Sequence, residues 1–304
     1  KVRYGLMLRE DGIAMDDGTA ARLAEDHFVV TTTTANAVGV YRHMEFVRQC
    51  LFPDLDVQLI STTEAWAQFS VAGPKARDLL QKVVDPEHDI SNEAFPYMAC
   101  GEITVGGVRG RLFRISFSGE LAYEIAVPTR YGDALIRRMV AAGEEFDAVV
   151  YGTEALGVMR IEKGHAAGNE LNGTTTALNL GMARMVNKKK DSIGSTLSER
   201  PGLNEDDALK LVGLRPVDPT NPVPAGAHLM TKGTPVDAAH DQGYVTSACY
   251  SPNLGHHIAI GYLKSGDARM GEVIRLVSPL TGVDHDVEVV SAHFIDPEGE
   301  RLRV

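Results

Sequence analysis

The sequence lacks the motifs that bind nucleotides, flavins and catalytic zinc in many enzymes. It contains no G-x-G-x-x-G, since the nearest stretch, Gly106 to Gly110, has the wrong spacing, and it contains no Walker A loop. H-E-x-x-H and the G-x-S-x-G nucleophile elbow are missing as well. The adjacent His256 and His257 would point to opposite faces of a strand, which is a poor geometry for a metal. We therefore expect no flavin, NAD or metal site in this chain.

Long apolar runs and cysteines are also scarce. No stretch approaches the roughly 18 apolar residues that a membrane span needs, and the start, Lys1 to Tyr4, has neither an initiator Met nor a signal-peptide core. We expect a processed chain or a fragment that does not cross a membrane. The three cysteines, Cys50, Cys100 and Cys249, are far apart and show no C-x-x-C spacing. They predict buried thiols in a reducing, cytoplasmic setting and no disulfide framework.

Basic residues are fewer than acidic ones. The sequence has 41 Asp and Glu but 30 Lys and Arg, which gives a formal net charge of -11. A polyanion would be repelled, so nucleic acid is not expected as a partner. The remaining composition is that of a globular protein, with 44% hydrophobic and 23% charged residues over 304 positions. That length is enough for two or three domains.

The first two thirds of the chain mix helical and strand-like patterns. Residues 5–34 predict strands with a turn at Asp16 to Gly18. A helix is predicted over about 36–50, because apolar residues recur there at spacings of three and four. Residues 55–142 predict the order strand, strand, helix, strand, strand, strand, helix, which is typical of an α+β lobe with an antiparallel sheet.

Three elements of this region are predicted from particular residues. Apolar residues at 57–60 indicate strand character before the strand at 66–71. In a strand over 111–117, three apolar residues alternate with Arg114 and two serines, which predicts one buried face and Arg114 on the opposite face. A helix is expected over 152–163, where the following glycine would end it.

The last third of the chain is strand-like throughout. It follows a polar stretch at about 195–209 that contains Pro-Gly and reads as a linker. Beyond it, short apolar runs alternate with Pro, Gly and Asn turns, and no helical period is evident. Strands are predicted at 211–214, 227–230, 244–249, 258–263, 273–277 and 287–291. This pattern predicts an all-β C-terminal domain, a small barrel or jelly-roll.

Five short tracts stand in a fixed order along the chain. They are Leu8–Ile13 with Asp16–Gly18 and Arg22–Leu23, Val71–Ala76, Ser118–Glu120 with Tyr123–Ile125, Arg160–Glu162 with Gly164, and Gly243–Ser247 with Tyr250–Pro252 and Leu254–Gly255. In this order they resemble motifs of the aminomethyltransferase family, the T-protein of glycine cleavage and its relatives. The resemblance covers nearly the whole chain. It implies an α+β, three-lobed fold with tetrahydrofolate in a channel between the lobes.

The resemblance also implies limits for the three lobes. The first combines residues 1–50 with 146–200, the second is 51–145, and the third is the C-terminal β-barrel or jelly-roll domain at 208–304. Within the family, the run Thr31–Thr34 leading into Ala35–Ala37 looks most like the C-terminal folate domain of the sarcosine oxidase alpha subunit, part of a heterotetramer.

That likeness implies a function and partners. The domain would accept a one-carbon methylene unit from oxidised sarcosine, and its partners would be flavin-bearing domains or subunits of the sarcosine oxidase complex. T-proteins proper carry a Lys-Asp after the early strand, whereas this chain has no aspartate between Asp26 and Asp54. Three alternatives stay open: a T-protein, a related folate-dependent demethylase, and a non-catalytic folate-binding scaffold.

Glu162 is the first candidate for the folate site. A pterin presents a ring N–H beside an exocyclic amine, and one carboxylate can accept from both. The family uses the glutamate of its R-x-E motif in this way, which the resemblance carries over to Glu162. Without the motif, a glutamate near a helix end would be read as a solvated surface residue.

The other candidates have equally plain structural readings. Tyr123 and Glu120 lie in the tract that resembles the family's [FY]-E strand. Tyr123 could equally be an aromatic residue of the core, and Glu120 could simply occupy a turn. Tyr151 would stack on a ring or fill the core. Arg184 and Lys188 to Lys190 place four positive charges in seven residues, either as a solvated loop or as a site for the folate glutamate tail. No residue is assigned to the chemical step.

The absence of a glycine-rich loop after a strand generates a first prediction. The purified chain should be colourless, because no segment is suited to hold the phosphates of a flavin or NAD. An absorption spectrum between 350 and 500 nm, recorded before and after heat release of bound cofactors, is the measurement. A flavin band at one equivalent per chain would contradict the prediction.

Overall fold

A computed structural model gives the positions of residues 1–187 and 189–304. The chain divides into two compact units, which we call unit 1 and unit 2. Unit 1 comprises Lys1–Gly5, Asp16–Gly152 and Gly299–Val304, and unit 2 comprises Leu6–Met15 and Thr153–Glu298. The three-lobe limits expected from the sequence stay a prediction. No helix within the described residues is both long and apolar enough to cross a membrane.

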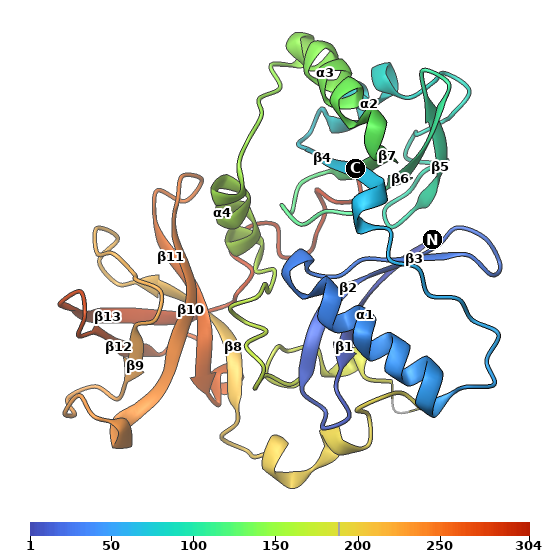
Figure 1. Ribbon diagram of the computed structural model, residues 1–304. Coiled ribbons are helices and arrows are strands. Elements are labelled where there is room, and N and C mark those ends of the chain that lie inside the picture. Colours follow the sequence, from blue (N-terminus) through green and yellow to red (C-terminus); the bar gives the residue numbers. More distant parts are fainter. Residues whose placement is uncertain (188) are drawn as a thin grey trace. The chain divides into compact units, whose positions relative to one another are not determined.

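Unit 1 contains a four-stranded antiparallel sheet with strand order β4-β7-β6-β5 (Figure 1). Two helices, α2 and α3, pack on one face of this sheet. The elements are β4 (Trp66–Ala72), α2 (Ala76–Val83), β5 (Cys100–Val105), β6 (Val108–Phe113), β7 (Ala122–Pro128) and α3 (Gly132–Gly143). Alternate residues such as Leu112 and Ile125 point into a core shared with Leu80 and Met139. The predicted α+β character is confirmed.

The chain begins with a three-stranded sheet of β1 (Val2–Leu8), β2 (Ala14–Arg22) and β3 (Phe28–Val30). The turn predicted at Asp16 to Gly18 is wrong, because these residues lie inside β2. Asp16 is buried, and its carboxylate accepts hydrogen bonds from the Thr33 N–H at 3.1 Å and the Thr33 hydroxyl at 2.7 Å. The chain turns earlier, at Gly12, whose φ of +86° suits glycine.

The helix expected after these strands is present as α1 (Ala37–Phe46), which continues as a π-helical turn over Val47–Leu51. Cys50 lies exposed on this turn, so the prediction that all cysteines are buried is wrong. Cys100 and Cys249 are half-buried, and all three thiols are free.

Two strand predictions in unit 1 are also wrong. Residues 57–60 form no strand, and Ile60 is 76% exposed. Strand β6 ends at Phe113, so the alternation expected through residue 117 does not continue and Phe117 is exposed. Arg114 is completely buried and donates to the Asn92 side-chain oxygen at 2.6 Å and the Phe95 carbonyl at 2.9 Å. A residue beyond the end of a strand no longer follows the strand period.

Unit 2 contains helix α4 (Thr153–Lys163) and a closed six-stranded barrel (Figure 1). The barrel strands are β8 (Leu209–Pro216), β9 (His228–Met230), β10 (Asp241–Ser251), β11 (His256–Lys264), β12 (Val273–Ser278) and β13 (Val283–Val290). Their order around the barrel is β10-β11-β8-β13-β12-β9. Fully buried Leu214, Leu229 and Leu276 lie in its core. The predicted C-terminal barrel and its six strands are confirmed.

Packing in the barrel core predicts a large effect of a single truncation. Leu229→Ala should lower the free energy of unfolding by about 2–5 kcal/mol, because it leaves a cavity at a fully buried site. Leu280→Ala is the matched control, since Leu280 is fully exposed and its loss should change stability by about 0.5 kcal/mol or less. Urea unfolding of both variants measures the difference. Equal stabilities would show that Leu229 is not part of a packed core.

Candidate functional site

The last turn of α4 is buried although it is rich in charge. Arg160, Ile161, Glu162 and Lys163 are each less than 9% exposed. Buried charges are stable only when paired or hydrogen-bonded, so each charged side chain here should have a partner. Gly164 ends the helix with a φ of +80°, and a Cβ at this position would lie 2.3 Å from the Ala292 carbonyl oxygen. Glycine is therefore required where α4 ends.

Glu162 is held at both its side chain and its main chain. One carboxylate oxygen, Oε1, accepts from the Ser251 hydroxyl at 2.5 Å, and the other, Oε2, accepts from the Asn253 amide at 2.8 Å. The main-chain carbonyl of Glu162 accepts from the N–H groups of Phe294 and Ile295, both at 3.0 Å. The carboxylate therefore has a fixed orientation. Each of its oxygens has a further lone pair beyond the one used by its donor.

The turn between β10 and β11 supplies both of these donors. Ser251 is the last residue of β10, and its hydroxyl accepts from the Leu254 N–H at 3.1 Å while it donates to Glu162. Gly255 closes the turn with a φ of +74° and an N–H bonded to the Ser251 carbonyl at 2.8 Å. Sequence reasoning identified this tract as a motif but missed Asn253. The signal that could have identified Asn253 is an amide side chain two residues after a serine at the end of a predicted strand.

A second buried cluster lies beside Glu162. The Arg160 guanidinium donates to Glu170 Oε2 at 2.9 Å and to the Ser247 hydroxyl oxygen at 2.6 Å, and the Ser247 hydroxyl donates to Glu170 Oε1 at 2.7 Å. The side chains of Arg160 and Glu170 are 9% and 0% exposed. Lys163 makes a buried ion pair with Asp296 at 3.2 Å. Every charged side chain in the last turn of α4 is thus paired or hydrogen-bonded within unit 2.

Cys249 lies on β10 between the two serines that serve these clusters. Ser247, Cys249 and Ser251 alternate along the strand, and the electrostatic influence of Glu162 and Arg160 reaches the Cys249 thiol. Burial, together with the negative charge of Glu162, raises the pKa of the Cys249 thiol to about 11, and Arg160 partly opposes this rise. The group is therefore a neutral thiol at physiological pH.

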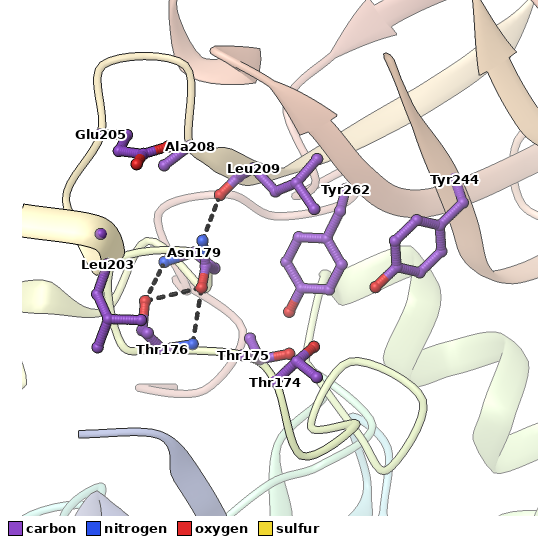
Figure 2. Close-up of a pocket in the computed structure, with 11 residues that line it drawn as sticks. Thr174, Thr175, Thr176, Asn179, Leu203, Glu205, Ala208, Leu209, Tyr244 and Tyr262 are labelled. Atoms are coloured by element: carbon purple, nitrogen blue, oxygen red, sulfur yellow. Dashed lines mark hydrogen bonds between the residues drawn. The ribbon is translucent and has the colours of Figure 1, made fainter. Parts of the chain in front are cut away.

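A pocket of about 290 Å³ lies in another part of unit 2 (Figure 2). Its lining includes Thr174 to Thr176, Asn179, Leu203, Tyr244 and Tyr262. Several of its polar groups already bond to the protein: Asn179 accepts from Thr176 and donates to the Leu209 carbonyl at 2.7 Å. The Tyr262 hydroxyl donates to the Glu170 carbonyl at 2.8 Å. None of the described residues predicted for folate binding lines this pocket.

The remaining predicted residues are distributed over both units. In unit 1, Tyr123 is completely buried in the core and accepts from Arg77 Nε at 2.9 Å, Glu120 forms an ion pair with Arg301, and Tyr151 is half-buried in the segment before α4. In unit 2, Arg184 is exposed on a short 3-10 turn, and Lys189 and Lys190 are exposed. Lys188 lies outside the described residues. A role of any of them in folate binding stays a prediction.

Comparisons with known proteins agree with this architecture. Residues 1–190 match the family model of the GCVT N-terminal domain, and residues 210–296 match that of the glycine cleavage T-protein C-terminal barrel domain. The chain belongs to the aminomethyltransferase family. The solved structure of the glycine cleavage aminomethyltransferase T from Bartonella henselae has the same fold, with a TM-score of 0.81 over 98% of this chain and 76% of that one, at 23% identity.

Among aminomethyltransferase-family relatives, several are parts of larger chains. The sarcosine oxidase subunit alpha of Rhizobium meliloti (strain 1021) is 48% identical over 307 residues, which is all of this chain and 31% of that protein. The corresponding subunit of Corynebacterium sp. (strain P-1) is 40% identical over 98% of this chain and again 31% of its own length. An aminomethyltransferase of Thermoanaerobacter sp. (strain X514) is 26% identical over 91% of this chain and 72% of its own. This chain thus spans about a third of the sarcosine oxidase subunits.

The environment of Cys249 generates a prediction on thiol reactivity. Only the thiolate reacts with iodoacetamide, so in a Cys50→Ser, Cys100→Ser background the alkylation of Cys249 at pH 8.5 should be slow. Glu162→Gln should speed it, because removing the negative charge lowers the pKa of the thiol. Mass spectrometry of the alkylated peptide gives the rates. A rate that does not respond to Glu162→Gln would contradict the electrostatic contact.

Proposed function

We propose that this chain is a tetrahydrofolate-binding, aminomethyltransferase-like domain of a sarcosine oxidase alpha subunit. Family membership and the 48% identity to a sarcosine oxidase subunit alpha support this assignment. The observation that carries it is the carboxylate of Glu162, in the position of the family's R-x-E glutamate, fixed by Ser251 and Asn253.

The geometry of Glu162 suits the edge of a pterin. Two N–H donors of the ring system need two acceptor oxygens in one plane, and a carboxylate offers them. The donors from Ser251 and Asn253 occupy one position on each oxygen and hold the carboxylate plane. The pterin would use the remaining lone pairs. Pre-orienting the acceptor in this way reduces the ordering cost of binding.

The proposed reaction is the capture of a one-carbon unit. Oxidation of sarcosine, at a flavin outside this chain, gives a methylene-iminium; tetrahydrofolate takes the methylene group, and glycine is released. Tetrahydrofolate supplies the attacking nitrogen when bound. The residues of this chain would bind and orient it, which alone accelerates a bimolecular step strongly. We assign no general acid or base to the chain.

The partners and the alternatives follow from the same evidence. Relatives named as subunits of sarcosine oxidase belong to a multi-subunit enzyme, and we propose that this chain likewise works beside flavin-bearing domains or subunits.

A glycine cleavage T-protein is less well supported, because the aspartate of that group is missing between Asp26 and Asp54. A folate-dependent demethylase and a folate-binding scaffold would share the Glu162 site and differ in turnover. The cytoplasmic location stays a prediction.

Replacing the carboxylate tests the proposed function. Glu162→Gln should weaken tetrahydrofolate binding at least tenfold, because truncating one partner of a buried charged hydrogen bond costs about 2–5 kcal/mol. Calorimetric titration of the chain with tetrahydrofolate measures the affinity. Glu288→Gln is the matched control, since Glu288 is on the barrel and pairs with Arg215.

The two variants separate a local from a general effect. Glu288→Gln should bind tetrahydrofolate as the wild type does. Unchanged affinity in Glu162→Gln would remove Glu162 from the folate site, and no binding to the wild type would overturn the proposed function.

A further inference from the structure

The sheet of unit 1 has a second face, opposite α2 and α3, that the proposed function does not use. Trp66 and Gln68 of β4, Arg111 of β6 and Glu124 of β7 lie on this face. Gln68 and Arg111 pair with Ala126 from its two sides, so the three residues form one row across the sheet. Glu124 is two residues from Ala126 along β7 and therefore shares its face.

Among the described residues, no carboxylate on this face bonds to Arg111, although the negative charge of Glu102 acts on it. Glu102 stands directly opposite Arg111 in the pairing of β5 with β6, but its carboxylate bonds instead to Arg109 at 2.6 Å. Among the described residues, no hydrogen bond or ion pair reaches the Arg111 side chain, and its Nε is buried without a partner. Burial lowers the pKa of Arg111, the negative charge of Glu102 partly opposes this, and the net direction reflects the cost of a partly desolvated cation.

Trp66 holds this guanidinium in place. The Arg111 guanidinium carbon lies 3.9 Å from the centroid of the Trp66 ring, close enough for a cation–π contact. Such a contact orients the planar group but satisfies none of its five N–H donors. Nε is the only nitrogen of Arg111 that is fully buried, so an acceptor from outside the chain could bond to the other N–H groups.

We propose that Arg111, held against Trp66, binds the carboxylate group of a ligand. A carboxylate matches the fork of a guanidinium with two parallel hydrogen bonds. A doubly charged phosphate is disfavoured, because Glu102 and Glu124 flank the site and the chain has a net charge of -11. Two sources of the carboxylate are consistent with the proposed function, on which this choice of source rests: the glutamate tail of a folate, and the amino acid substrate or product.

The single tryptophan of the chain makes the site directly observable. Trp66 is the only tryptophan, so a ligand bound at Arg111 should change the fluorescence of the protein. The probes are γ-linked triglutamate, sarcosine and glycine, none of which absorbs in the region of tryptophan emission. Each is titrated at constant ionic strength, and sodium chloride is titrated separately.

Matched variants make the test specific. A saturable change is expected with at least one carboxylate probe, and Arg111→Gln should weaken that binding at least tenfold. Arg111→Lys keeps the charge but loses the fork, and it should bind with intermediate affinity. Arg137→Gln should behave as the wild type, since Arg137 is exposed on α3 and pairs with Asp133. Circular dichroism establishes that the variants fold, and Arg111→Lys serves if Arg111→Gln does not.

The outcomes discriminate between the possibilities. Saturation by triglutamate alone assigns the site to a folate tail, and saturation by sarcosine or glycine assigns it to the amino acid. No saturable change with any probe, the same change with sodium chloride, or an unaltered titration in Arg111→Gln would overturn the site. The proposed function is tested at another residue and by another method, namely calorimetry of Glu162→Gln with tetrahydrofolate. A failure of the proposed function can therefore be distinguished from a failure of the Arg111 site.

Discussion

The buried ion pair between Arg160 and Glu170 fixes the end of α4 against strand β10, and the rest of the candidate site depends on it. Burying two charges is expensive, and such a pair is often no more stabilising than apolar residues of the same size. Its effect here is on position. Arg160 also bonds to Ser247, so the helix end is tied to one point on β10, and Glu162 then meets Ser251, four residues further along the strand.

Helix geometry shows why this arrangement needs two separate clusters. Residues two apart on a helix are about 200° apart around its axis, so Arg160 and Glu162 cannot share one face. Both are nevertheless buried, because Arg160 bonds to Glu170 and Ser247, whereas Glu162 bonds to Ser251 and Asn253 at the end of β10. A buried helix end that carries several charged residues is stable only if each charge has its own partner. Gly164 allows the end of α4 to approach the backbone at Ala292 closely, which this packing requires.

The sequence allowed a prediction of the fold where local patterns and tertiary structure agree, and it failed where side chains bond at a distance. The barrel and α4 were predicted because alternation, turn residues and a terminal glycine all indicate them. Asp16 resembled a turn residue, yet its carboxylate binds Thr33 on the far side of the hairpin and stays within β2. Glu162 was identified only through the family motif. The contact of Asn253 with Glu162 depends on the conformation of the turn between β10 and β11, which the spacing of residues in the sequence does not show.

Arg114, which is completely buried, shows by contrast why the lack of a partner at the half-buried Arg111 is informative. Arg114 is completely buried and also has no carboxylate partner among the described residues. Its charge is met instead by oxygen atoms of Asn92, Phe95, Leu302 and Val304 at 2.6 to 3.3 Å. The chain can therefore supply several oxygen acceptors to a buried guanidinium, although the Nε of Arg114, like that of Arg111, has no partner among the described residues. At Arg111 it supplies only an aromatic ring, while the opposite carboxylate of Glu102 bonds to Arg109. The N–H groups of Arg111 other than the buried Nε remain available on one face of the sheet, as a site for a carboxylate requires.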